Sequence, residues 1–228
     1  DYSGNRTAVF LGMEPDINVC RYGLRWRVPL VNKDAVVPKL TSAGVVGTMP
    51  NIPANRLNSQ FDYGGASVTV SAADQSGFCA LKLAHHALSA GEIDVAIVAA
   101  VDLCNDPVQA RAAGIPIERL GDAAVSFVIK RRSDAQRAGD EILATLSPAA
   151  QPGAGVDFTA LLGENMAAHD LRDLAGLILS STGDFIVGDT FPFAAHVPSV
   201  VTLQPRQMAG PTVIFNTHGT PLEVQNMT

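Results

Sequence analysis

The sequence lacks the features of nucleic-acid-binding, membrane-spanning and disulfide-stapled proteins. It holds 16 Lys and Arg against 22 Asp and Glu, a formal net charge of −6, so it has no overall basic field for nucleic acid or anionic lipid. Its longest uninterrupted apolar run, residues 95–101, is far too short to cross a bilayer. Its cysteines, Cys20, Cys79 and Cys104, are odd in number and widely spaced, which favours reduced thiols and a cytoplasmic protein.

Motifs for metal ions and phosphate groups are also missing. The adjacent histidines His85 and His86 would point about 100° apart on a helix, so they cannot share an ion. The pair Gly64 and Gly65 lacks the lysine and the third glycine that a phosphate-binding loop requires. We therefore expect neither a metal ion nor a cofactor.

The chain begins at Asp1 rather than at methionine, although its 228 residues and 47% apolar content are ample for a core. A strand-like run at residues 7–12 follows almost at once, and no apolar signal segment precedes it. We expect residue 1 to lie inside a longer natural polypeptide.

Apolar runs alternate with helical patterns, which predicts an α/β sheet covered by helices on both faces. The expected strands are residues 7–13, 67–71, 95–101 and 122–130. Helical segments are expected at residues 44–47, 51–60 and 73–90. In the last of these, apolar residues recur at spacings of three and four, and Gly91 is a natural C-terminal stop.

The second half of the chain is less regular. A stretch rich in Pro, Ala and Gly predicts a linker at residues 147–156. After it we expect an amphipathic helix at residues 171–178 and a closing hairpin made of residues 199–203 and 212–216. The linker divides the chain into residues 1–146 and 157–228.

The most informative segment, residues 55–81, has the sequence NRLNSQFDYGGASVTVSAADQSGFCAL. It resembles the nucleophile region of β-ketoacyl synthases, the condensing enzymes of fatty-acid and polyketide synthesis, whose pattern runs NR[IL]S, FDLxGPS and TVDTACSSS. In that family the segment places an acyl-accepting cysteine at the start of a buried helix. Backbone N–H groups there stabilise the thiolate and the oxyanion of the thioester.

Three further strings are similar to the same family: LSAGEIDVAIVAAVD at residues 88–102, LGDAAVSFVIKR at 120–131 and SDAQRAGDEILA at 133–144. The resemblance covers residues 7 to about 146 and implies a thiolase-like layered α/β/α fold, shortened relative to a full ketosynthase. Residues 1–146 then correspond to the N-terminal region of a ketosynthase, and residues 157–228 to a shortened C-terminal region.

Aligned residue by residue, Asp74 stands where the family carries its nucleophilic cysteine. A carboxylate is a poor acyl acceptor, because its acyl product is an anhydride that water destroys. Cys79 lies five residues further on and is expected to be an inert packed thiol. Gln75 is turned about 100° from position 74 on a helix and does not substitute for the cysteine. We expect Asp74 to cap the N-terminus of its helix.

The family's catalytic histidines have two candidate positions. The alignment that we favour sets Glu164, in LGENMAAH, against the histidine of the GHT string. The rival alignment sets His218, in HGTPL, against the histidine of HGTGT. Neither alignment yields a complete Cys-His-His set, so we do not expect this chain to catalyse condensation alone.

The string GTMPNIPANR at residues 47–56 is similar to the second ketosynthase-like domains of bacterial polyunsaturated fatty-acid and glycolipid synthases. The resemblance implies a pseudoenzyme of chain-length-factor type, which forms a heterodimer with an active ketosynthase, meets its acyl carrier protein and shapes the tunnel for the acyl chain. Pairing would run edge to edge through the strand at residues 67–71.

Two other hypotheses remain. One is an enzyme, a malonyl-thioester decarboxylase or hydrolase with Asp74 or Glu164 as base and His218 or His169 nearby. The other is a fragment with no activity of its own.

Overall fold

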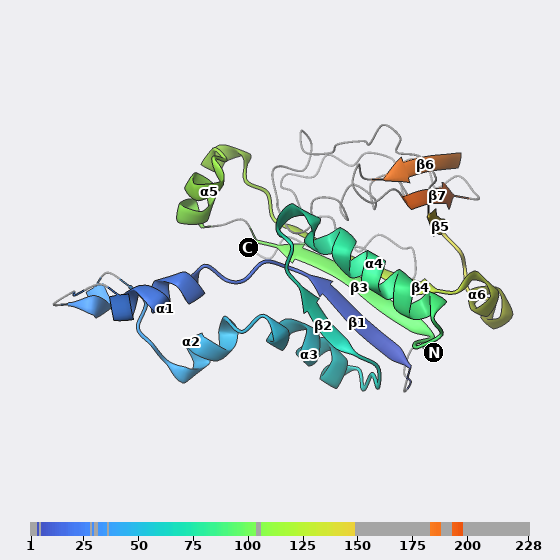
Figure 1. Cartoon of the computed structure of the whole chain (residues 1–228), viewed down its shortest axis with the longest axis horizontal. Coiled ribbons are helices and arrows are strands. Elements are labelled where there is room, and N and C mark those ends of the chain that lie inside the picture. The colour runs from blue at the N-terminus through green and yellow to red at the C-terminus, as the bar shows by residue number, and fades with distance from the viewer. Residues whose placement is uncertain are drawn as a thin grey trace, which may run out of the picture.

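The computed structural model of the chain describes residues 4, 6–27, 29, 32–35, 37–103, 106–148, 183–187 and 193–197. Its centre is a four-stranded sheet in the order β2-β1-β3-β4 (Figure 1). The strands are β1 (Thr7–Gly12), β2 (Ser67–Val70), β3 (Val95–Asp102) and β4 (Ala123–Lys130). β1 runs parallel to both β2 and β3, and β4 runs antiparallel to β3. The four strands predicted from the sequence are thus confirmed to within one residue at each end.

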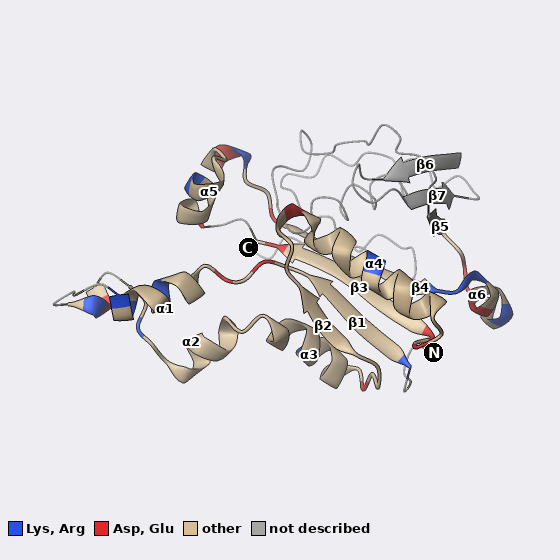
Figure 2. Ribbon diagram, viewed as in Figure 1, with Lys and Arg blue, Asp and Glu red and all other residues tan. Residues whose placement is uncertain are grey.

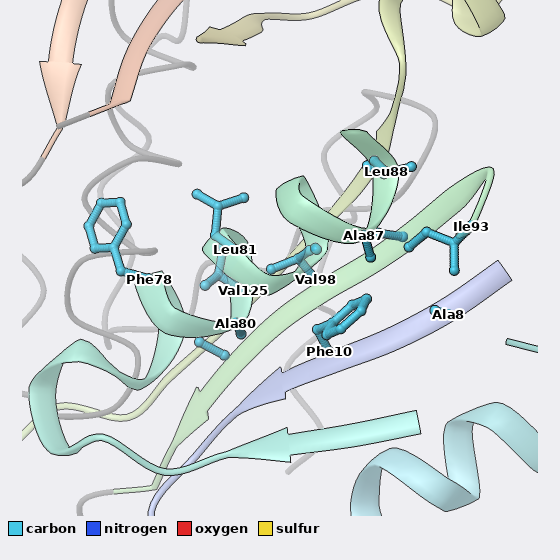
Figure 3. Packing of buried hydrophobic residues seen from close by; sticks show 13 residues of the cluster. Ala8, Phe10, Phe78, Ala80, Leu81, Ala87, Leu88, Ile93, Val98 and Val125 are labelled. Carbon is cyan, nitrogen blue, oxygen red and sulfur yellow. The ribbon is translucent and has the colours of Figure 1, made fainter. Parts of the chain in front are cut away.

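Helix α4 (Ser76–Ser89) lies on one face of this sheet (Figure 3). Phe78 and Leu81 of the helix belong to one buried cluster with Phe10 of β1 and Val98 of β3. Burying each such side chain stabilises the fold by roughly 1.5–3 kcal/mol. The helix ends at Ser89, and Gly91 follows its C-cap residue Ala90 with a φ of +73°, which confirms the predicted stop.

Helix α3 (Asn51–Gln60) covers the opposite face. Alternate residues of a strand point to opposite sides, so Val9 and Leu11 of β1 face away from α4. They form a second buried cluster with Ala54 of α3. The expected sheet between two helical layers is therefore present.

Helices α1 (Asn18–Arg27) and α2 (Ser42–Gly47) extend away from the sheet beyond the carboxyl end of β1 (Figure 1). α2 is the short helix expected there, and Thr41 caps it by accepting a hydrogen bond from the Gly44 N–H at 3.1 Å. α1 was not predicted, because prolines on either side of it dominate the pattern.

The remaining described elements follow β3 and β4. They are α5 (Pro107–Ala113), α6 (Arg132–Ala138), β5 (Thr145–Pro148), β6 (Gly183–Val187) and β7 (Phe193–Val197). The last three form an antiparallel sheet in the order β5-β7-β6. β5 includes the first two residues of the expected linker, whereas the helix expected at 171–178 and the hairpin at 199–216 lie outside the described residues. Within the part of the chain that is described, no helix is long and apolar enough to span a membrane.

A carboxylate joins three separate segments at the amino end of β1. Asp94 accepts hydrogen bonds from Arg131 Nη2 at 2.5 Å and from Arg6 Nε at 2.8 Å. Arg131 also donates to the main-chain oxygens of Leu88 and Ile93, at 3.1 and 2.6 Å. The hydrogen bond from Arg131, with that from Arg6, holds the pKa of Asp94 below its ordinary value.

We expect Arg131→Met to lower the free energy of unfolding by about 1–2 kcal/mol at neutral pH, because Asp94 loses one of its two arginine partners and its side chain is 47% exposed and partly screened. The pKa of Asp94 is lower in the folded protein than in the unfolded chain. Its contribution to the free energy of unfolding is therefore complete above the unfolded-state pKa of about 4, and it is lost as the pH falls through the folded-state pKa. Urea unfolding across a pH series measures this. The difference in unfolding free energy between wild type and variant should become smaller at acidic pH. A difference that stays constant with pH would contradict the role given to Asp94.

Gly12 lets the end of β1 approach the start of α4. A Cβ at this position would lie 2.6 Å from three main-chain atoms, Gly77 N and the carbonyl carbon and oxygen of Ser76. Main-chain atoms in a packed helix cannot move aside cheaply, so only glycine fits without displacement.

The substitution Gly12→Ala should therefore destabilise the protein by about 1–3 kcal/mol, measured by denaturant unfolding. Gly23→Ala is the matched control, since a Cβ at Gly23, inside α1, meets nothing within 4 Å. That change should be neutral or stabilising by up to about 1 kcal/mol. Equal effects of the two substitutions would contradict the close approach.

Candidate functional site

The chain turns sharply between β2 and α4, at the segment that carries Asp74. Ala73–Gln75 forms a short 3₁₀ turn, and the α-helix begins at Ser76 rather than at residue 73 as expected. Ala73 has a φ of +53°, a left-handed conformation that costs an L residue about 1–2 kcal/mol. Such strain persists only where neighbouring groups hold the turn in place.

Glu14, two residues beyond β1, is the group that holds it. Its Oε1 accepts hydrogen bonds from Ser71 Oγ at 2.7 Å and from the Ala73 N–H at 2.8 Å. The same oxygen lies 3.1 Å from Ser76 Oγ, which is also 2.6 Å from the Ala73 carbonyl, so the single hydroxyl proton is shared between two acceptors. One carboxylate oxygen thus fixes the end of β2, the strained residue and the first residue of α4.

Asp74 does not cap α4, so that expectation is wrong. Gln75 occupies the N-cap position of the helix and makes no capping bond with its side chain. Instead, Ser76 Oγ accepts from the Ala72 N–H at 2.9 Å, and the Ala73 N–H is taken by Glu14. The side chain of Asp74 is exposed beside this network.

Of the other candidate residues, some lie in the described part of the chain and others do not. Cys79 is a free, partly buried thiol on α4, in keeping with the packed role expected for it. Glu164, His169 and His218 lie outside the described residues, so their distances from Asp74 stay predictions. No group of three potential metal ligands gathers among the residues for which the structure gives positions.

The role of Glu14 could have been predicted from the order of the strands, although the family motif does not include this residue. Glu14 and Ala73 are 59 residues apart in the chain. However, β1 and β2 are parallel neighbours with Gly12 opposite Val70, so the residues that follow each strand must meet at the same edge of the sheet. A carboxylate two residues after one strand and a serine just after the other are natural partners at that edge.

The turn lies at the start of a helix and beside the carboxyl ends of parallel strands, where the main-chain N–H groups of the helix favour negative charge. The first 114 residues, half of the chain, match the family model described as beta-ketoacyl synthase, N-terminal domain. The chain belongs to the β-ketoacyl synthase family. The predicted resemblance is confirmed at this level.

Curated relatives of this ketosynthase-like chain are large synthases. The spectinabilin polyketide synthase system protein NorA of Streptomyces orinoci is 32% identical over 176 residues, which are 69% of this chain and 9% of that protein. The highly reducing polyketide synthase pspA of Penicillium soppii is 29% identical over 186 residues, or 73% of this chain and 7% of that protein. A polyunsaturated fatty acid synthase polypeptide of a Thraustochytrium species is 29% identical over 116 residues, which are 44% of this chain and 6% of that protein. The chain therefore spans less than a tenth of each of these relatives.

Solved structures confirm the thiolase-like ketosynthase fold. A β-ketoacyl synthase from Burkholderia phymatum STM815 aligns with a TM-score of 0.51 at 18% identity, covering 64% of this chain and 40% of that one. A mutant ketosynthase from module 6 of the bacillaene synthase of Bacillus subtilis 168 aligns with a TM-score of 0.54 at 15% identity. The alignment covers 99% of this chain and 49% of that one.

Removing the Glu14 carboxylate should loosen the turn. Glu14→Ala leaves the Ala73 N–H without its acceptor, so we expect a loss of about 1–3 kcal/mol in unfolding free energy and faster amide hydrogen exchange at residues 71–76. Glu14→Gln is the matched control, because its carbonyl oxygen can still accept those bonds, and it should recover at least half of the loss. Wild-type exchange in the alanine variant would contradict the role given to Glu14.

Proposed function

We propose that this chain is a non-catalytic ketosynthase-like domain of chain-length-factor type. It pairs with an active β-ketoacyl synthase in polyketide or fatty-acid synthesis, meets the acyl chain that the acyl carrier protein delivers, and shapes the tunnel for that chain. The observation that carries the proposal is Asp74, an exposed carboxylate at the turn where the family places its nucleophilic thiol.

The chemistry of a carboxylate supports this assignment. Thioester exchange onto a thiol gives another thioester of similar energy, whereas exchange onto Asp74 would give a mixed anhydride that hydrolyses readily. A carboxylate also places negative charge beside the position where the thioester oxygen becomes negative, which raises that barrier. The condensing reaction is thus disfavoured both at acyl loading and at its transition state.

The thiol that is nearest in the sequence does not restore the nucleophile. Cys79 lies five residues beyond Asp74 and within α4, whereas Asp74 lies in the 3₁₀ turn before the helix. Its partly buried position on α4 is therefore displaced from the turn that presents residue 74.

An open sheet edge supports the pairing. β2 is the end strand of the four-stranded sheet and pairs only with β1 among the described strands. Unpaired main-chain groups on an edge strand are a ready site for a strand from another chain. A ketosynthase-fold partner that adds its own β2 equivalent would extend the sheet across a two-fold or pseudo-two-fold axis.

The test uses the protein purified from its native cells with whatever it binds. We expect a ketosynthase to co-purify, and Asp74→Ala to leave condensation by that complex within about twofold of the wild-type rate, because position 74 carries no chemistry. The chain alone should release no carbon dioxide from a malonyl thioester.

The control for this assay is replacement of the nucleophilic cysteine in the co-purified ketosynthase, which should abolish condensation. Two results would overturn the proposal. One is decarboxylation or hydrolysis by the chain alone that disappears in Asp74→Ala, which would establish the acyl-thioester enzyme with Asp74 as base. The other is a chain that purifies without any ketosynthase.

A further inference from the structure

Sequence pattern and structure differ about where α4 begins. The helical pattern predicts a helix from residue 73, whereas the α-helix begins at Ser76 and residues 73–75 form a 3₁₀ turn. Local preference and tertiary structure agree at most positions of a folded protein, so a conflict between them often marks a functional element. The conflict lies in residues 71–75, which we name the turn segment.

The turn segment contains the signal for an earlier helix start. Ser71 and Asp74 have the spacing of a capping box, S-x-x-D. In a capping box the serine hydroxyl accepts a hydrogen bond from a main-chain N–H of the first turn, and the acidic side chain accepts one from the N–H of the serine. The two residues between them are alanines, which favour helix more than any other residue. This local sequence would start α4 one turn earlier, with Ser71 as its N-cap.

Glu14 diverts the groups that the capping box would use. The Ser71 hydroxyl donates to Glu14 Oε1 at 2.7 Å, and the Ala73 N–H donates to the same oxygen at 2.8 Å. In this arrangement Ala73 has a φ of +53°, which no residue of an α-helix adopts. The Asp74 carboxylate is exposed and accepts no hydrogen bond within the part of the chain that the structure describes. Glu14 is thus the group that keeps the turn segment out of the helix.

The rest of α4 is held in place by its packing. Ser76 is fully buried, and Phe78 and Leu81 belong to the cluster between the helix and the sheet (Figure 3). A rearrangement at the start of α4 is therefore confined to the turn segment and to the end of β2. There, the Val70 carbonyl accepts a hydrogen bond from the Met13 N–H at 3.0 Å.

The charges at this edge of the sheet also favour an earlier helix start. Figure 2 shows acidic residues both on the segment that follows β1 and at the turn before α4. Neither Glu14 nor Asp74 forms an ion pair with a cation among the described residues. A carboxylate in the first turn of a helix is stabilised by the main-chain N–H groups there. Asp74 would gain this stabilisation if the helix began before it.

We propose that the turn segment is a conformational switch with two states. In the turn state, which the structure shows, Glu14 binds Ser71 and the Ala73 N–H, and the Asp74 carboxylate is exposed. In the helical state Glu14 is released, Ser71 and Asp74 form the capping box, and α4 begins one turn earlier. The switch therefore decides whether the Asp74 carboxylate is presented at the turn or engaged at the end of the helix.

Opposing contributions separate the two states. The hydrogen bonds of Glu14, with the bond between Met13 and Val70, favour the turn state. Relief of the left-handed Ala73 and the added helical hydrogen bonds favour the helical state. A group that binds the released Glu14 carboxylate shifts the populations toward the helical state. A cationic group does so best, because it replaces neutral donors with a charge-assisted hydrogen bond.

Nuclear magnetic resonance of the isotope-labelled full chain tests the switch. The coupling between the N–H and Hα protons of Ala73 reports its φ, and contacts between Hα of one residue and the N–H four residues later are specific to an α-helix. We expect neither a negative φ at Ala73 nor such contacts within residues 71–76 of the wild type. Glu14→Ala should show both, whereas Glu14→Gln should keep the turn state, because its carbonyl oxygen still accepts hydrogen bonds.

Substitutions in the Glu14→Ala background test the parts of the switch. Asp74→Ala removes the capping box and should lower the ratio of helical to turn state at least about twofold. Ala73→Gly should lower it at least about fivefold, because glycine both tolerates the left-handed φ and disfavours helix. Ala72→Gly is the matched control, since residue 72 has a φ of −149° and no left-handed cost to relieve. Its effect should be clearly smaller.

Two results would overturn the inference. One is a Glu14→Ala variant whose turn segment frays without helical contacts, which amide exchange alone does not distinguish from the helical state. The other is an equal effect of Ala73→Gly and Ala72→Gly. Both are measured on the chain without a partner, so they leave the proposed pairing with a ketosynthase untouched.

Discussion

The burial of β1 is the constraint on which the described fold depends. All six of its residues are buried, because β2 and β3 flank it in the sheet while α4 and α3 cover its two faces. A strand enclosed on every side has no freedom of register, since a shift by one residue would exchange Val9 and Leu11 with Ala8 and Phe10 between two different cores. The position of β1 therefore fixes Gly12 and Glu14, and these two residues determine where α4 starts and how the turn before it is held.

Much of this arrangement could be predicted from the sequence, because the sheet is built from short apolar runs that are bounded by clear stops. Residues 95–101 are apolar throughout, as a central strand requires, and Gly91 ends the preceding helix with the positive φ that favours glycine. The family motif, in turn, correctly indicated the family. These features depend on the local sequence pattern, so they could be predicted without knowledge of contacts between distant segments.

The parts that escaped prediction depend on contacts between distant segments. α1 is stabilised by Arg25 and Tyr22, which contact residues that come later in the chain, and prolines flank the helix on both sides. Asp74 was expected to cap α4 because a carboxylate near a helix start usually does so. The helix starts later than expected, with Gln75 at its N-cap, because Glu14 binds the Ala73 N–H and Ser76 Oγ and holds residues 73–75 in a 3₁₀ turn. Glu14 comes from the segment that follows β1, so the group that shapes this turn cannot be identified from the turn alone.

The bonds of Glu14 also explain how position 74 can tolerate chemical change. The turn is held by Ser71, Ala73 and Ser76, and the side chain of residue 74 contributes nothing to holding it. The side chain at position 74 can therefore change without loss of the turn. A protein engineer could use this exposed position to install a nucleophile of choice on a scaffold that does not depend on it.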